Sequence, residues 1–149
     1  MKIRLSLPEE KKAPVGEALL RHGIEIGEDA EYTLIETPRS GNFLNVRDKE
    51  SRALRLSTDQ IVFIEAFGKE VEVHTLQETC YSQDRIYRLE ELLDPREFIR
   101  ISKSVIIAKR CVKRIRPALT MKFVLTLSDG SLVDVTRNYY TNFRRFFNI

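Results

Sequence analysis

The sequence predicts a mainly β fold of small antiparallel sheets, with nine or ten short strands and two or three short helices. Apolar and polar residues alternate along several short runs, which is typical of strands with one buried face. Ser128, Asp129 and Gly130 join two such runs, at residues 121–127 and 131–136, and an Asp-Gly pair in this position is a strong signal for a hairpin turn. Helical spacing of apolar residues is restricted to a few short stretches.

The first 42 residues are predicted to be a small extension of strand, helix and strand before a main domain over residues 43–149. Strands are expected at 2–7 and 32–36 and a helix at 13–22, because proline and glycine residues separate these runs. The extension is too small for us to expect an independent domain.

The main domain is predicted to begin with strands at 43–46 and 52–57, followed by a hairpin over residues 61–76. The hairpin turn contains Gly68. In its second strand the valines alternate with glutamate and histidine, so one face of that strand should be exposed.

Two helices are expected in the main domain. The first covers residues 85–93, with Asp84 as its N-terminal cap and Pro95 as its stop. The second covers residues 138–147 and leaves its two arginines in solvent. Its inward side chains are expected to be Tyr140, Phe143 and Phe147.

The stretch from Phe98 to Arg116 combines a strand that looks buried with seven Lys or Arg residues and no acidic residue. Its alternation predicts an extended segment that is interrupted near residues 102–104. At the interruption we expect the polar side chains to face outward. The side chains expected to anchor the strand in the core are Phe98, Ile101, Val105 and Ile107.

The composition indicates one ordinary core in a chain of 149 residues, 42% hydrophobic and 32% charged. Cys80 and Cys111 are the only cysteines, too few for a disulfide framework or a four-ligand zinc site, so we expect no metal and no cofactor. Apolar runs are shorter than a bilayer span or the core of a leader peptide. We therefore expect a cytoplasmic protein.

Charge is unevenly distributed along the chain, although the net charge is only +3. Residues 1–60 carry 10 basic and 11 acidic side chains, residues 61–98 carry 4 and 9, and residues 99–149 carry 11 and 2, which gives −1, −5 and +9. A basic segment of this kind is typical of a surface that meets a polyanion, because Lys and Arg near phosphates release counterions. The alternative is that the acidic and basic segments pair with each other on folding.

Enzyme motifs are absent from the sequence, which has no glycine-rich phosphate loop, no G-x-S-x-G and no H-E-x-x-H. His74 and Cys80 would make a base and a nucleophile if the fold brought them together. The simpler interpretation is an exposed strand histidine and a small apolar cysteine. We therefore expect no enzyme activity and no small-molecule substrate.

The order of elements resembles the LytTR DNA-binding domain of bacterial transcriptional regulators over about residues 43–149. The resemblance is carried by F-x-R-x-x-x-S with an apolar strand after it from Phe98 to Ile107, by the Asp-Gly hairpin, and by V-x-R-x-Y from Val135 to Tyr139. It implies an elongated, nearly all-β fold whose loops enter successive major grooves of double-stranded DNA.

The resemblance also implies three contact places for DNA. One is the turn around Lys69, the second is the interruption after Phe98, and the third follows the last strand. Arg137 is the residue expected to read a base, because a guanidinium can bond two acceptors on one guanine edge. The residues implied are Lys69, Arg100, Ser102, Lys103, Ser104, Arg137 and Asn138.

Regulators of this kind bind repeated sites, so a homodimer is expected. The roughly 40 residues before the match are too few for a receiver domain, and the resemblance is to stand-alone regulators, some of them paired with a small inhibitory membrane protein. The extension is then a candidate for dimerisation or regulation. Two other functions remain open from the residues alone: an RNA- or general polyanion-binding β-module, and an adaptor whose basic face meets an acidic protein.

Overall fold

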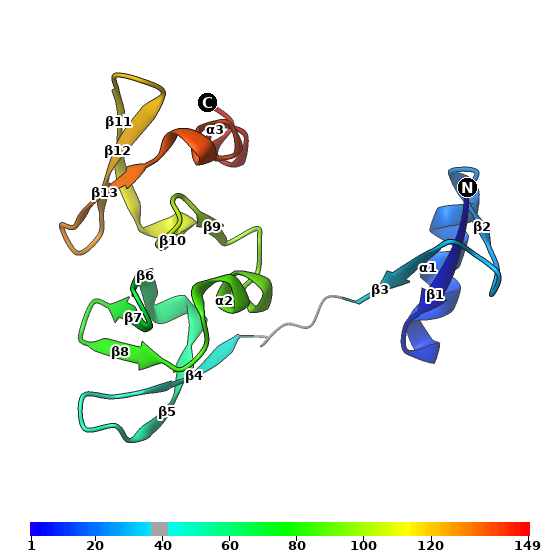
Figure 1. Ribbon diagram of the computed structural model, residues 1–149, viewed down its shortest axis with the longest axis horizontal. Helices are drawn as coiled ribbons and strands as arrows, with labels where there is room; N and C mark the ends of the chain where they lie inside the picture. Colours follow the sequence, from blue (N-terminus) through cyan, green and yellow to red (C-terminus); the bar gives the residue numbers. More distant parts are fainter. Residues whose placement is uncertain (37–41) are drawn as a thin grey trace. The chain divides into compact units, whose positions relative to one another are not determined.

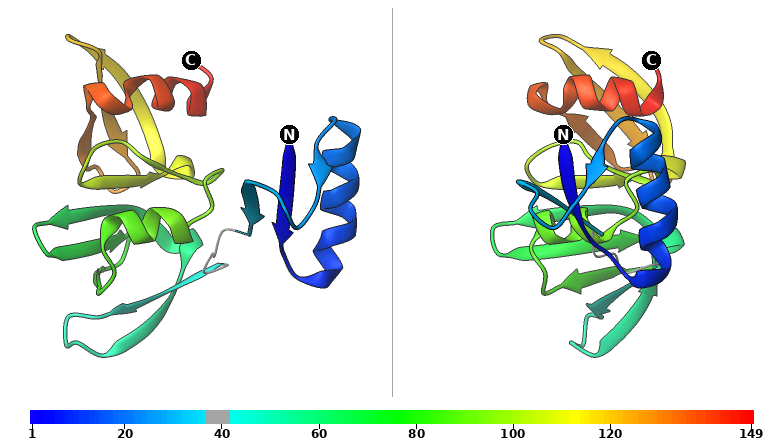
Figure 2. Two further views of the ribbon diagram at one scale, coloured as in Figure 1. Left: turned by 45° about the vertical axis from the view of Figure 1, so that its right-hand side comes forward. Right: turned by 90° about the vertical axis from the view of Figure 1, so that its right-hand side faces the viewer.

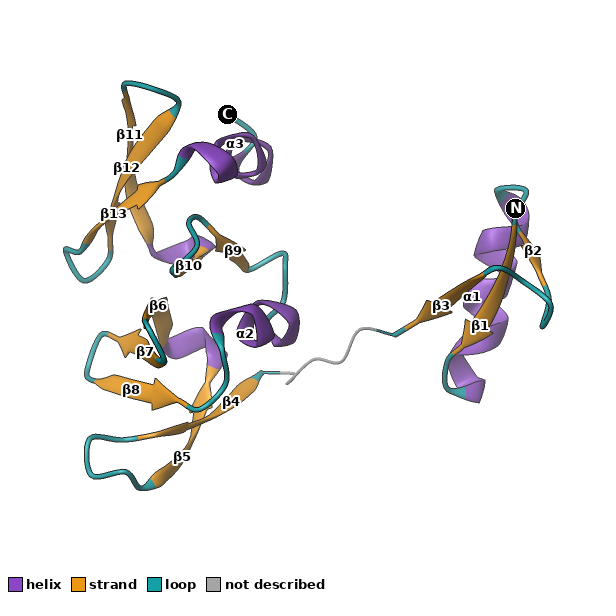
Figure 3. Cartoon of the chain, viewed as in Figure 1, coloured by secondary structure: helices purple, strands orange, loops and turns teal. Residues whose placement is uncertain are grey.

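The structure is a computed structural model that describes residues 1–36 and 42–149. It divides into two compact units, Met1–Pro38 and Arg39–Ile149 (Figures 1 and 3). Across the described residues there are thirteen strands and three α-helices, so the mainly β class is confirmed and the predicted number of strands is too low.

The first unit is a three-stranded parallel sheet with a helix. Its elements are β1 (Lys2–Ser6), α1 (Glu9–Arg21), β2 (Glu25–Ile26) and β3 (Tyr32–Ile35), with β1 in the middle of the sheet. The predicted helix start at residue 13 is wrong, because the helix begins directly after Pro8 and contains Pro14. Gly16 allows a close approach to the sheet, since a Cβ there would lie 3.1 Å from Ile26 Cδ1.

The second unit contains a seven-stranded antiparallel sheet in the order β5-β4-β8-β7-β6-β10-β9. Its strands are β4 (Phe43–Arg47), β5 (Ala53–Ser57), β6 (Ile61–Phe67), β7 (Glu70–Thr75), β8 (Thr79–Ser82), β9 (Phe98–Arg100) and β10 (Val105–Ala108). Short 3₁₀ turns, η1 (Thr58–Gln60) and η2 (Lys109–Cys111), precede β6 and follow β10.

Burial in this sheet follows the predicted alternation. Val71 and Val73 of β7 are buried. Of the polar residues that alternate with them, Glu70 is exposed, and Glu72 and His74 are half-buried. All four residues of β10 are buried, and each of the four predicted anchors from Phe98 to Ile107 lies in the core.

The helix α2 (Ile86–Leu92) packs its apolar face on β6, β9 and β10. Ile86 and Leu89 are the buried side chains of this face. The predicted cap at Asp84 is wrong: the N-cap residue is Arg85, and no side chain caps the helix. The backbone N–H of Asp84 donates instead to Ser82 Oγ at 3.0 Å, so Asp84 belongs to the preceding turn.

A second antiparallel sheet consists of β11 (Val112–Ala118), β12 (Lys122–Leu127) and β13 (Leu132–Val135). The predicted Asp-Gly hairpin is confirmed, with Gly130 at φ +85° and the N–H of Ser131 bonded to Asp129 Oδ1 at 2.9 Å. In Figures 1 and 2, β9 and β10 lie between this sheet and the strands β6 to β8.

The helix α3 (Tyr140–Phe147) covers this second sheet and confirms the predicted terminal helix. Tyr140 stacks on Phe123 with ring centroids 4.8 Å apart, and Phe143 is fully buried between Phe123 and Phe147. Its arginines are exposed, as predicted. The aromatic packing fixes where the chain leaves β13.

Replacing Phe143 with alanine should lower the free energy of unfolding by about 3–5 kcal/mol, because truncation leaves a cavity in a fully buried site. Urea denaturation followed by circular dichroism measures this change. Arg145→Ala, an exposed change on the same helix, is the control and should stay within about 0.5 kcal/mol. A loss below about 1 kcal/mol for Phe143→Ala would contradict the described packing.

Candidate nucleic-acid interface

Backbone hydrogen bonds bring the three predicted contact places together. The N–H of Ala66, near the β6–β7 turn, donates to the carbonyl of Ser104 at 2.8 Å. The N–H of Thr136, directly after β13, donates to the carbonyl of Ile101 at 3.0 Å. The loop between β9 and β10 is therefore attached at one end to the β6–β7 hairpin and at the other to the chain before α3.

Four predicted contact residues are exposed at these places. Lys69 lies in the β6–β7 turn, Lys103 in the β9–β10 loop, and Arg137 with Asn138 in the 3₁₀ turn η3 (Arg137–Tyr139). Within residues 1–36 and 42–149, none of these side chains forms a hydrogen bond or an ion pair, so Arg137 does not pair with Asp134 there. Their polar groups are free to meet a ligand.

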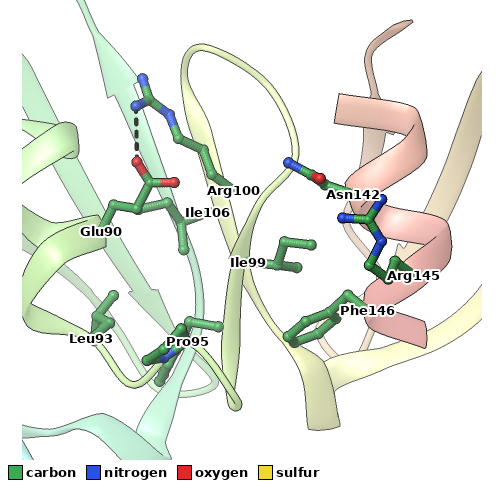
Figure 4. Close-up of a pocket in the computed structure, with 10 residues that line it drawn as sticks. Glu90, Leu93, Pro95, Ile99, Arg100, Ile106, Asn142, Arg145 and Phe146 are labelled. Atoms are coloured by element: carbon green, nitrogen blue, oxygen red, sulfur yellow. Dashed lines mark hydrogen bonds and ion pairs between the residues drawn. The ribbon is translucent and has the colours of Figure 1, made fainter. Parts of the chain in front are cut away.

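Arg100 has a different role, because its guanidinium is already occupied. It donates to the carbonyl of Ser102 at 3.1 Å and to the carbonyl of Lys103, and it pairs with Glu90 of α2 at 3.3 Å. Figure 4 shows the Glu90 contact, and the Arg100 side chain is only 18% exposed. Arg100 thus holds the loop rather than facing outward.

Ser102 is also turned inward, contrary to the expectation for this stretch. It is buried, and its hydroxyl accepts the N–H of Ser104 at 3.2 Å. The hydroxyl therefore closes a tight turn that leaves Lys103 at the tip. Ser104 is half-buried, with its Oγ 3.5 Å from that of Ser102.

The basic side chains after β10 differ in whether they contact other parts of the protein. Arg110 reaches back over a large sequence separation and donates to the carbonyls of Asp59 and Ile61, the latter at 2.8 Å. Lys109 is exposed, and its Nζ lies 5.0 Å from the centre of the Phe146 ring. The exposed basic side chains on β11 that form no hydrogen bond or ion pair in the described parts of the chain are Lys113, Arg114 and Arg116.

His74 and Cys80 do not form a catalytic pair. In the β7–β8 ladder His74 lies opposite Thr79, while Cys80 lies opposite Val73, so the two side chains point to opposite faces of the sheet. His74 Nδ1 is 3.3 Å from Thr79 Oγ1, and its ring stacks on Phe63. The histidine is held by its neighbours on the sheet surface.

Cys80 is poorly suited to act as a nucleophile. Burial and then the neighbouring carboxylate of Glu78 raise the pKa of the Cys80 thiol to about 11. A thiol with a raised pKa stays protonated at neutral pH and reacts slowly.

An open hollow of about 330 Å³ lies between α2, β9 and α3 (Figure 4). Leu93, Pro95 and Ile99 form much of its apolar wall. Arg145 and Phe146 project toward it from α3. In the described residues no group of three or more His, Cys, Asp or Glu side chains is arranged to hold a metal ion, in this hollow or elsewhere.

Residues 51–148 match the family model of the LytTr DNA-binding domain. The match covers well over half of the chain, including the three joined contact places. The chain belongs to the LytTR DNA-binding domain family. The LytTR match includes both antiparallel sheets apart from β4, and it excludes the whole first unit.

Two sensory transduction proteins from Bacillus species are similar to part of the chain. The sensory transduction protein LytT of Bacillus anthracis is 26% identical over 100 residues, which are 67% of this chain and 41% of that protein. LytT of Bacillus subtilis is 24% identical over 94 residues, 63% of this chain and 39% of that protein. The chain therefore matches well under half of the length of these relatives.

A solved LytTr DNA-binding domain from Bacillus cereus has the same fold. It superposes with a TM-score of 0.69 at 22% identity, covering 74% of this chain and all of that domain. Among the described residues, no helix has both the length and the apolar character needed to cross a membrane.

The sequence named Arg100 and Ser102 as contact residues, but their role in positioning the loop was not predicted, and Arg110 was not among the named residues. The pairing of Arg100 with Glu90 and that of Arg110 with distant carbonyls depend on tertiary contacts, and local patterns carry no signal for them. The S-x-S spacing of Ser102 and Ser104 is the one local sign that a side chain closes this turn.

Replacing Arg100 with methionine should loosen the β9–β10 loop, because the change keeps the apolar stem and removes every donor to the loop carbonyls. We expect amide hydrogen exchange at Lys103 and Ser104 to become faster by at least about tenfold, as measured by NMR. Arg96→Met, which breaks an exposed pair with Asp94 in another turn, is the control. Unchanged exchange in the loop would contradict the positioning role.

Cys80 should resist iodoacetamide at pH 8 in the folded protein, because its raised pKa keeps the thiol neutral below about pH 11. Mass spectrometry of peptides measures the modification at each cysteine. In urea both buried cysteines should react readily. Modification of folded Cys80 at the rate of an exposed cysteine would show that the thiol is activated.

Proposed function

We propose that this protein is a sequence-specific transcription regulator that binds double-stranded DNA through loops in successive major grooves. The observation that carries the proposal is the joining of three exposed polar places by the Ala66–Ser104 and Thr136–Ile101 backbone bonds. A rigid framework of this kind lets loops present side chains to base edges in a fixed order. The LytTR membership supports DNA as the partner.

Arg137 is proposed to read a base. It is exposed and has no partner among the described residues, and a guanidinium bonded to two acceptors on guanine contributes about 1–3 kcal/mol of discrimination. Asn138 beside it offers an amide for the same groove. Both residues lie in the 3₁₀ turn that leads into α3, the helix anchored by the fully buried Phe143.

Lys69 and Lys103 are proposed to contact phosphates, since a flexible ammonium offers a point charge rather than a bidentate fork. Ser104 is half-buried, and we propose that it contacts DNA only at the place where Lys103 does. Arg100 and Ser102 are proposed to hold the β9–β10 loop in the conformation that presents Lys103 to the DNA. The free basic side chains of β11 add an electrostatic field that carries no sequence information.

The active form is proposed to be a cytoplasmic homodimer on two repeated sites. Linking two binding modules raises affinity for paired sites without any new contact to DNA. Control by a small membrane protein stays a prediction from the family resemblance.

At one position of the selected site, Arg137→Ala should reduce the difference in binding free energy between the preferred base and the other bases by about 1–3 kcal/mol. Lys113→Ala, on exposed β11, is the matched control: it should weaken all duplexes about equally and reduce the slope of log K against log salt by about one. Fluorescence anisotropy with selected and scrambled duplexes at several salt concentrations measures both effects.

Equal affinity of the unchanged protein for every duplex at physiological salt would overturn the proposal. Competition with double-stranded RNA of the same sequence distinguishes the proposal from the polyanion-binding alternative. If the loops read the major groove of B-form DNA, the RNA should displace the DNA only weakly. An adaptor for an acidic protein would show no salt-dependent binding to nucleic acid.

A further inference from the structure

The edges of the three sheets are protected unequally. Edge strands expose unpaired N–H and C=O groups, and proteins guard them with charged residues, proline or very short length. In the described parts of the chain the edge strands are β2 and β3, β5 and β9, and β11 and β13. All of them except β3 carry a charged side chain: Glu25, Arg55, Arg100, Asp134 and the basic residues of β11.

The strand β3 has the sequence Tyr-Thr-Leu-Ile and contains neither a charge nor a proline. It pairs with β1 on one side, and no described strand pairs with its other side. Tyr32 is 56% exposed and Ile35 is 65% exposed, although both residue types favour the interior of a sheet. This edge has the composition of a strand that is paired on both sides.

The first unit also lacks the core needed to stand alone. Gly16 is its only buried residue in the described range 1–36, so no apolar side chain there is fully removed from water. Domains below about 40 residues usually need disulfides, metals or oligomerisation to fold. This unit has no cysteine, and its described residues include no group of metal ligands.

We propose that the free edge of β3 pairs antiparallel with β3 of a second copy of the chain, so that two sheets of three strands become one sheet of six. A second copy fits because one strand can pair with itself across a two-fold axis, and because oligomerisation stabilises a unit of this size. The inference deepens the proposed function, in which a homodimer reads repeated sites.

A two-fold axis perpendicular to the sheet keeps every side chain on its own face. Leu34 pairs with Leu5, whose Cδ1 lies near Gly16, so Leu34 and Tyr32 belong to the face covered by α1. Thr33 and Ile35 belong to the opposite face, where Arg4 donates to Thr33 Oγ1 at 3.1 Å. With Leu34 of one copy opposite Leu34 of the other, an antiparallel pair brings these two apolar side chains together on the face that α1 covers, with both helices on the same face.

The test uses the full chain and the double variant Tyr32→Lys/Ile35→Lys, which places the charges of a guarded edge on β3. Sedimentation equilibrium should show a dimer for the unchanged protein and self-association weakened by at least about tenfold for the variant, since lysine side chains on an edge strand oppose its pairing with another strand. Ala18→Lys/Leu20→Lys, which adds the same charge to exposed positions of α1, should dimerise normally.

Hydrogen exchange gives a second readout that needs no variant. Within β3, the amides that do not donate to β1 should be protected in the unchanged protein, and their protection should fall as dilution separates the copies. A protein that is monomeric at every concentration would overturn the inference, as would protection of these outward amides in the monomer or unaltered association of the Tyr32→Lys/Ile35→Lys variant.

DNA binding separates this inference from the proposed function. The Tyr32→Lys/Ile35→Lys variant should retain the affinity of the unchanged protein for a duplex with one site and lose the added affinity for two repeated sites. Dimerisation through β3 without DNA binding would refute the proposed DNA-binding function alone. DNA binding by a permanent monomer would refute the inference and the proposed homodimer, and would leave the DNA-binding function intact.

Discussion

The candidate interface depends on how the loop between β9 and β10 is held. Main-chain hydrogen bonds attach its two ends to Ala66 and Thr136, and the Arg100 guanidinium binds two of its carbonyls. These bonds limit the freedom of the loop, since Ala66 belongs to the strand β6 and Ile101, at the other end, is fully buried. The relative positions of Lys69, Lys103 and Arg137 are therefore set by the backbone, and their side chains remain available for a ligand.

The fully buried strand β10 explains why so much positive charge can surround a core strand. Its four apolar residues anchor the segment, and the charges lie where the chain leaves the core. Positive charge does not by itself mark a contact, since Arg100 and Arg110 both donate to carbonyls within the protein. Among the basic residues of this stretch, Lys103, Lys109 and those on β11 are exposed and donate to no carbonyl of the described residues, and Lys109 lies over the Phe146 ring.

Local patterns predicted the parts of the fold that are local in origin. The Asp129-Gly130 turn, the half-exposed β7 and the amphipathic α3 each follow from residues that are neighbours in sequence. The burial of Ser102 and the bonds of Arg110 depend on residues far along the chain or on a tight turn, so periodicity does not reveal them. The predicted Asp84 cap failed because the Ser82 hydroxyl takes the N–H of Asp84 in a turn of its own. Within the site, the family resemblance named both the exposed tips and Arg100 with Ser102, whereas the positioning role of these two residues was not predicted.

The most direct test of this account is an NMR titration of the full chain with a duplex selected from random DNA. We expect amide shift changes to cluster at residues 68–70, 102–104 and 137–138 together, and to saturate at one common DNA concentration. Changes confined to β11, or changes at only one of the three places, would contradict the joined interface and leave only general attraction to a polyanion.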